Sequence, residues 1–231
     1  MIAPALVGGT VVVAGVAAHG AFYRNSFVFG RALGRLPTRD AVLALTFDDG
    51  PNPEATPRIL DALGEAGVHA TFFILGRHAE RWPALVRRVR DEGHALGNHG
   101  YFHRKLHVKS PRYVREDLGL GSDTIADACG MRPTLFRAPH GFRSPWVNAV
   151  AASLGERVIG WSLGVWDSDR PGADVIAQRT VVGARPGSIL LLHDGDGYDP
   201  AGDRTQTAAA VPRIVADLEG RGYRFVTVPA A

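Results

Sequence analysis

The chain has 231 residues, 45% hydrophobic and 21% charged, a composition typical of a globular protein with one large domain or two small ones. This composition excludes a disordered chain and a fibrous one. The net charge is +3, from 26 Lys and Arg against 23 Asp and Glu, and no basic cluster alternates with aromatic residues, so nucleic-acid binding is not expected.

The N-terminal 23 residues contain no Lys, Arg, Asp or Glu, and they include the apolar run ALVGGTVVVAGVAAHGAF. This run is about long enough to cross the hydrocarbon core of a bilayer as a helix. Its glycines weaken helix propensity, but membrane helices tolerate glycine better than soluble helices do. We predict an apolar helix over residues 1–23, either a membrane helix or an uncleaved signal anchor. A cleaved signal peptide and a buried soluble segment are the alternatives.

Residues 24–39 carry four arginines and no acidic residue, and we interpret them as a basic connector to a domain over residues 40–231. By the positive-inside rule these arginines favour a cytoplasmic position for that domain. We expect a membrane-anchored domain that faces the cell envelope. The cytoplasmic face of the membrane, which the arginines favour, is the alternative.

Short apolar runs alternate with helical patterns from residue 41 onward. Helical spacing is seen, for example, at Trp82, Leu85, Val86 and Val89. Apolar strands separated by helices are typical of a parallel sheet with both faces covered. The predicted strands are residues 41–47, 70–75, 94–98, 134–139, 157–163, 188–193 and 224–228. Seven such units predict a single α/β catalytic domain, a distorted (β/α)7 barrel of parallel strands.

Polar residues follow six of these runs, where the chemistry of such a barrel collects. Random surface polarity would rarely select His, Asp and Arg so consistently. The groups are Asp48 with Asp49, Gly76 with Arg77, residues 99–103, residues 137–140, Trp166 with Asp167, and His193 with Asp194. The sequence therefore predicts one site at the carboxyl edge of the sheet.

Two adjacent carboxylates, Asp48 and Asp49, lie in the segment TFDDGPNP directly after a predicted strand. Their side chains must diverge, so one can coordinate a metal while the other faces bound water. The alternative is an Asp-rich turn that caps the helix beginning near Glu54.

His99 and His103 are four residues apart in the segment NHGYFH. On a helical turn this spacing places both rings on one face, which suits a shared metal ion. Zinc binds histidine nitrogen and carboxylate oxygen, and two histidines with one aspartate leave a coordination position for water. A pair of surface histidines is the alternative interpretation.

Three further strand ends carry candidate catalytic groups. In FRAPHG, Arg137 could orient a carboxylate, and the backbone N–H of His140 could donate to a developing oxyanion. His193 ends a buried strand, where it could act as a general acid or base, and Asp167 could raise its pKa. Trp166 could stack on a sugar face. A salt-bridged strand end and a core histidine are the structural alternatives.

The five motifs TFDDGPNP, HGYFH, RAPHG, a Trp-Asp pair and LLLHD occur in the order found in the NodB-homology polysaccharide deacetylases, carbohydrate esterase family 4. The chain resembles this family over roughly residues 40–228. The resemblance implies metal-dependent hydrolysis of N-acetyl groups on N-acetylglucosamine units of chitin-like or peptidoglycan polymers, with an N-acetylated glycan as substrate. It also implies these roles: Asp49, His99 and His103 as zinc ligands, Asp48 as general base, Arg137 as its partner, the His140 amide as oxyanion donor, His193 as general acid, and Asp167 as the partner that tunes it.

The sequence departs from the family pattern at two of these positions. His140 stands where a tyrosine is common, and Trp166 precedes Asp167 where an Asp-Trp pair is usual, so Asp169 is a rival for the role given to Asp167. Cobalt or another divalent ion is an alternative to zinc. The alternative activities are an O-acetyl esterase on xylan-like polymers and a deformylase or deacetylase acting on a lipid-linked sugar. A glycan-binding module is the alternative without catalysis.

Overall fold

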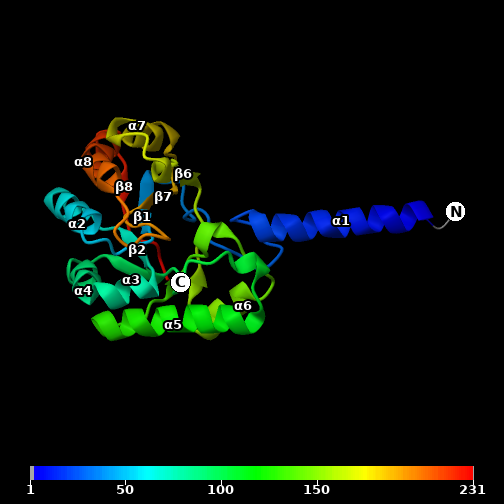
Figure 1. The fold of residues 1–231 in the computed structure, drawn as a ribbon. Coiled ribbons are helices and arrows are strands. Elements are labelled where there is room, and N and C mark those ends of the chain that lie inside the picture. The colour runs from blue at the N-terminus through cyan, green and yellow to red at the C-terminus, as the bar shows by residue number, and fades with distance from the viewer. Residues whose placement is uncertain (1–2, 231) are drawn as a thin grey trace.

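The computed structural model describes residues 3–230, and within them eight strands form one parallel sheet that helices surround (Figure 1). The strands hydrogen-bond in the order β5-β4-β3-β2-β1-β7-β6, and β8 pairs with β1 off this path. Their bounds are β1 Val42–Asp48, β2 Thr71–Ile74, β3 Ala95–Asn98, β4 Leu135–Phe136, β5 Arg157–Val158, β6 Leu163–Gly164, β7 Ile189–His193 and β8 Arg224–Phe225.

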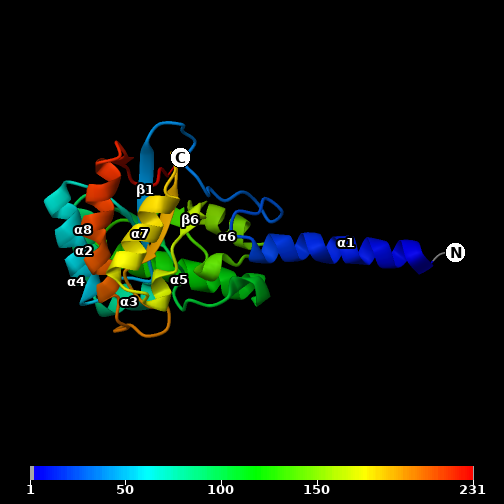
Figure 2. The same cartoon turned by 90° about the horizontal axis from the view of Figure 1, so that it is seen from above.

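Seven helices belong to the domain, and an eighth, α1 Ala3–Phe22, projects away from it (Figure 2). These seven are α2 Ala55–Ala66, α3 Gly76–Arg81, α4 Pro83–Asp91, α5 Pro111–Cys129, α6 Val147–Ser153, α7 Ala173–Gly183 and α8 Thr205–Glu219, with short 3-10 turns at Leu106–Val108, Pro139–Gly141 and Asp167–Asp169. Helices on the outside explain why the strands are apolar on both faces. Every residue of β1 is buried, for example.

Local sequence determines where these helices begin and end. In α2 the buried face is formed by Ile59, Leu60 and Leu63 at helical spacing. Gly67 ends this helix in the left-handed conformation, with φ 66°, which glycine adopts without steric cost. At the start of α5, the Ser110 side chain accepts a hydrogen bond from the backbone N–H of Tyr113.

The parallel register brings the carboxyl ends of the strands to one edge. Asp48 of β1 pairs directly with His193 of β7. Further along the sheet, Asn98 of β3 pairs with Phe136 of β4, so the segments that follow both strands leave the sheet side by side. The groups that the sequence analysis singled out therefore start from adjacent positions.

The prediction of a single α/β domain with parallel strands is confirmed, and six predicted strands lie where short strands occur. The predicted strand over residues 157–163 is wrong, because the chain there forms two short strands, β5 and β6, at opposite ends of the strand order. The hydrogen-bonded ladder consequently does not run from β5 to β6, and the sheet is a parallel half-barrel.

The N-terminal segment occupies the edge of β5 that β6 does not reach. Leu33 donates its backbone N–H to the Val158 carbonyl at 3.0 Å, and its own carbonyl accepts from the Gly160 N–H at 2.9 Å. Side chains bind the carbonyls that follow: Gly160 accepts from Arg137 at 3.0 Å, and Trp161 accepts from Arg24 Nε at 3.0 Å and from Asn25 Nδ2 at 2.9 Å.

The N-terminal segment is helical over Ala3–Phe22, and residues 1–2 lie outside the described residues. Among the described residues, no helix has the length and apolarity needed to cross a membrane. The membrane helix predicted for residues 1–23 is thus not confirmed and stays a prediction. The stretch that follows, interpreted above as a connector, forms β-bridges with the domain through Leu33 to Ile159 and Arg35 to Ser188.

Candidate active site

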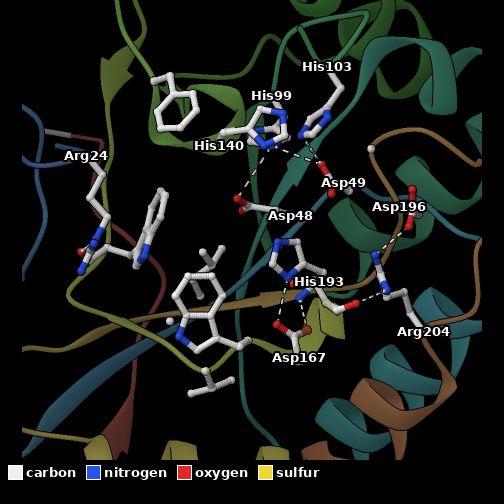
Figure 3. Close-up of a pocket in the computed structure, with 18 of the residues that line it drawn as sticks. Arg24, Asp48, Asp49, His99, His103, His140, Asp167, His193, Asp196 and Arg204 are labelled. Carbon is white, nitrogen blue, oxygen red and sulfur yellow. Dashed lines mark hydrogen bonds and ion pairs between the residues drawn. The ribbon is translucent and has the colours of Figure 1, made fainter. Parts of the chain in front are cut away.

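A cavity of about 720 Å³ opens at the carboxyl edge of the sheet (Figure 3). It is lined by residues from the ends of β1 and β7 and from the loops around them. Of the predicted site residues, only Arg137 does not line the cavity; it lies beneath it. The lining contains the other eight: Asp48, Asp49, His99, His103, His140, Trp166, Asp167 and His193. The structure therefore brings these groups together around one cavity.

Asp49, His99 and His103 form a candidate metal centre. Asp49 Oδ1 lies 3.3 Å from His99 Nε2 and 3.1 Å from His103 Nε2, and one ligand atom from each residue lies within 4.8 Å of the others. All three residues are buried. Within the described residues, Asp49 Oδ1 nevertheless makes no hydrogen bond of normal geometry. A buried carboxylate oxygen between two ring nitrogens, with no donor of its own, fits a divalent cation.

Neighbouring groups orient these candidate ligands. His99 Nδ1 lies 2.8 Å from the carbonyl oxygen of Arg137, so with the proton on Nδ1 it presents Nε2 to the cavity. His78 is buried, and its Nδ1 lies 2.8 Å from the Asp49 carbonyl oxygen. Gly197 packs so closely on His103 that an added Cβ would lie 2.1 Å from Nδ1.

Burial controls the charge of the candidate ligands. It lowers the pKa of His103 to about 3, although Asp49 opposes the shift, so this ring is neutral at pH 7 and offers a lone pair. Burial would raise the pKa of Asp49, but His103 and His99 outweigh it and hold that pKa below its usual range. A neutral imidazole and an ionised carboxylate are the protonation states that bind metal.

Asp48 lies beside the candidate metal ligands and is held in place by Arg137. Arg137, which is fully buried, donates to Asp48 Oδ1 at 2.6 Å and to Thr46 Oγ1 at 2.8 Å. Asp48 Oδ2 lies 3.8 Å from His99 Nε2. The guanidinium therefore holds one carboxylate oxygen and leaves the other beside the metal-ligand group.

His193 and Asp167 form the second acid-base pair of the cavity. Asp167 Oδ1 lies 2.9 Å from His193 Nδ1, while Oδ2 accepts from the His193 backbone N–H and from Thr207 Oγ1. Burial would lower the pKa of His193, but Asp167 raises it to about 9. The ring is therefore protonated at neutral pH. Asp169, the rival partner, is exposed and does not line the cavity.

His140 and Trp166 form parts of the rim. The His140 ring lies 4.6 Å from that of His103, centroid to centroid, and its Nε2 lies 3.0 Å from the hydroxyl of Tyr198. Trp166 is 71% exposed, which leaves its ring free to contact a ligand. Tyr198 was not predicted, although the Gly- and Asp-rich loop after β7 marks a strand end of the same kind.

The helical turn expected for His99 and His103 is wrong. Residues 99–103 form an irregular loop, and His103 has φ 55°. The loop is held by the Asn98 side chain, whose Oδ1 accepts from the Gly100 N–H at 2.8 Å. The two rings meet, at 5.3 Å between centroids, because the loop turns back over the strand end.

Backbone strain is concentrated around the cavity. Five non-glycine residues between 3 and 230 have positive φ. Four of them line the cavity, namely Asp49, His103, His140 and Trp166, and the fifth, Arg170, does not. Each such conformation costs roughly 1–3 kcal/mol and persists where the surroundings enforce it. This concentration independently supports the cavity as the candidate functional site.

The polysaccharide deacetylase family model matches residues 35–159. A peptidoglycan-N-acetylglucosamine deacetylase of Bacillus cereus is 37% identical over 198 residues, which is 84% of this chain and 89% of that protein. A chitooligosaccharide deacetylase of Sinorhizobium fredii is 38% identical over 205 residues, covering 86% of this chain and 95% of that protein.

The fold has relatives among solved structures as well. A peptidoglycan N-acetylglucosamine deacetylase crystallised with 4-naphthalen-1-yl-N-oxidanyl-benzamide superposes with a TM-score of 0.81 at 34% identity, over 86% of this chain and 91% of the other. Sequence and structure agree, so the chain belongs to the polysaccharide deacetylase family.

Proposed function

We propose that the protein is a metal-dependent deacetylase that removes N-acetyl groups from N-acetylglucosamine-containing glycans of the chitooligosaccharide or peptidoglycan type. The observation that carries the proposal is the meeting of three groups around one cavity. These are the metal-ligand set of Asp49, His99 and His103, the Asp48–Arg137 pair, and the His193–Asp167 pair. The names of the relatives support the substrate class.

Zinc is the cation that we propose for the ligand set of one carboxylate and two imidazoles. When bound, zinc would polarise the acetyl carbonyl and lower the pKa of water to about 7. Cobalt binds similar donors and is the alternative.

Asp48 is the proposed general base. Its Oδ1 is held by Arg137 at 2.6 Å, so Oδ2 has a defined position from which to accept a proton of the attacking water. As the water oxygen bonds to the acetyl carbon, the carbonyl oxygen gains charge. The backbone N–H of His140 is the proposed donor to it.

His193 is the proposed general acid. An amine leaves poorly as an anion, so the breaking C–N bond requires a proton on nitrogen, and His193 carries one at neutral pH because of Asp167. The products are acetate and a glycan amine. Trp166, exposed on the rim, is proposed to stack on a sugar ring.

Acetate release by the full chain tests the proposal. The substrates are chitooligosaccharides and peptidoglycan fragments, each assayed with added zinc and with a chelator. We expect acetate with zinc and none with chelator. A folded, zinc-loaded protein that releases no acetate would refute deacetylation, and formate or O-linked acetate release from other glycans would then support the alternative activities.

Variants separate the proposed roles. Asp48→Asn should lower kcat by about 10²- to 10⁴-fold and retain the metal, whereas His103→Ala should lose the metal. Asp169→Asn is the matched control, since Asp169 is an exposed aspartate outside the cavity. Full activity in Asp48→Asn would exclude this base, and unchanged metal content in His103→Ala would remove that residue from the ligand set.

A further inference from the structure

Arg24 is a cavity residue that comes from outside the part of the chain matched by the family model, which begins at residue 35. Its guanidinium carbon lies 5.1 Å from the ring centroid of Trp161, another lining residue, and its Nε donates to the Trp161 carbonyl at 3.0 Å. Figure 3 shows Arg24 on the opposite side of the site from Arg204. The guanidinium is therefore a fixed part of the wall.

Contacts with the domain fix the backbone on either side of Arg24. Asn25 Nδ2 donates to the same Trp161 carbonyl at 2.9 Å. Arg143, fully buried, donates its backbone N–H to Ala21 at 3.1 Å and its guanidinium to the carbonyl oxygen of Ser26. Because these hydrogen bonds bracket Arg24, its side chain is presented to the cavity from a docked backbone.

The charge of Arg24 is not neutralised by the protein. Arg204, the other arginine that lines the cavity, pairs with Asp196 at 2.8 Å. Arg137 below the cavity pairs with Asp48. Among the described residues, no carboxylate lies within ion-pair distance of Arg24, and its Nη1 and Nη2 groups make no hydrogen bond to the protein. A half-buried guanidinium whose Nη1 and Nη2 groups are both free is suited to bidentate binding of a carboxylate or phosphate.

We propose that Arg24 is a specificity-determining residue that binds an anionic group, a carboxylate or a phosphate, on the glycan near the sugar that loses its acetyl group. This inference rests on the proposed deacetylase function and refines its substrate class. It predicts that the protein prefers anionic glycans, such as peptidoglycan fragments with carboxylates, over neutral chitooligosaccharides. The Trp161 ring restricts the guanidinium to one orientation, which lowers the entropy lost on binding.

The test compares three substrates of matched length: a neutral chitooligosaccharide, the same oligosaccharide with a terminal carboxylate, and one with a terminal phosphate. For the wild type, kcat/KM should be higher for at least one anionic substrate, and Arg24→Gln should reduce that preference by about tenfold. The readout is the ratio of kcat/KM for the anionic substrate to that for the neutral one, and an equal loss on both substrates would contradict the proposal. The carboxylate and phosphate substrates identify which anion the site prefers.

Two variants control the comparison. Arg31→Gln removes the same charge from an exposed arginine in the same segment that does not line the cavity, and it should retain the preference. Arg24→Lys keeps the charge and should retain part of the preference, which a merely structural role of Arg24 would not produce. An unchanged melting temperature shows that Arg24→Gln is folded.

Binding is measured separately in the Asp48→Asn background, where turnover is expected to be about 10²- to 10⁴-fold slower. Titration calorimetry with the three oligosaccharides should show the same preference and its loss when Arg24→Gln is added. Equal affinity for neutral and anionic glycans would overturn the inference even if the wild type releases acetate. Absence of acetate with a clear Arg24-dependent preference would instead refute the proposed function alone.

Discussion

The buried Arg137–Asp48 pair makes a sharp prediction about stability. Arg137 has 0% exposure, and it donates to Asp48 at 2.6 Å, to Thr46 at 2.8 Å and to the Gly160 carbonyl at 3.0 Å. Replacing it by methionine leaves the Asp48 carboxylate buried without its cation. Loss of one partner of a buried ion pair typically costs about 3–5 kcal/mol of the free energy of unfolding.

A double-mutant cycle isolates the charge contribution. Asp48→Asn alone leaves Arg137 without its anion, so it should also be costly. The double variant leaves neither charge, and it should therefore lose several kcal/mol less than the sum of the two single losses. The assay is urea unfolding with a chelator present, because bound metal would add stability by mass action. The exposed pair Arg58–Glu54, at 2.9 Å, provides a control cycle with an expected coupling of about 0.3–0.5 kcal/mol.

The result that would refute this reasoning is additivity. If the two single losses sum to the double loss within about 0.5 kcal/mol, the pair is not coupled. The geometry that we assign to the general base would then need another explanation, since Arg137 would not be holding Asp48.

Three other predictions concern acid-base behaviour and metal binding. The pKa of His193 is raised to about 9, so kcat/KM should be maintained at neutral pH and fall as pH rises through about 9. Asp167→Asn should move this fall to lower pH. A pH profile that does not move would exclude the pairing. Burial raises the pKa of Glu156 from 4.5 to about 8, so the folded protein holds that proton more firmly than the unfolded chain does, and stability should decrease as pH rises from about 4.5 to 8. Glu156→Gln should flatten this decrease in urea titrations at a series of pH values. Gly197→Ala should weaken zinc affinity by about 10- to 100-fold in a competition titration, because the new Cβ would lie 2.1 Å from His103 Nδ1; unchanged affinity would show that the loop adjusts.

The strands were predictable because burial on both faces leaves a direct mark on the sequence. The run over residues 41–47 is apolar apart from Thr46, since the strand Val42–Asp48 has no solvent-facing side. The run over residues 157–163 has the same appearance and was misinterpreted. There the N-terminal segment pairs with the strand edge through Leu33, and Arg24 and Asn25 bind the Trp161 carbonyl; these contacts span more than a hundred residues of sequence. Sequence periodicity carries no information about such distant donors.

The candidate site was predictable to the extent that it depends on strand ends. In a parallel sheet all carboxyl ends share one edge, so Asp48 and His193 were expected in one site before any geometry was known. The structure adds that their strands are direct neighbours. The conformation of the loops that follow the strand ends was not predictable. His99 and His103 meet through an irregular loop with a left-handed residue, whereas their spacing suggested a helical turn. Similarly, no pattern identified His78 as the group that contacts the Asp49 backbone.

The cavity therefore has two parts with different origins. The strand ends supply the acids, bases and candidate metal ligands, and the family resemblance rests on these. The N-terminal segment supplies Phe22 and Arg24, which line the same cavity but precede the matched region. The proposed chemistry therefore resides in one part of the cavity wall and the unpaired charge of Arg24 in the other, so a change in Arg24 can alter the preference for substrate charge without a change at the strand ends. Substrate preference in this protein should accordingly be sought in residues 22–24 as well as at the metal-ligand set.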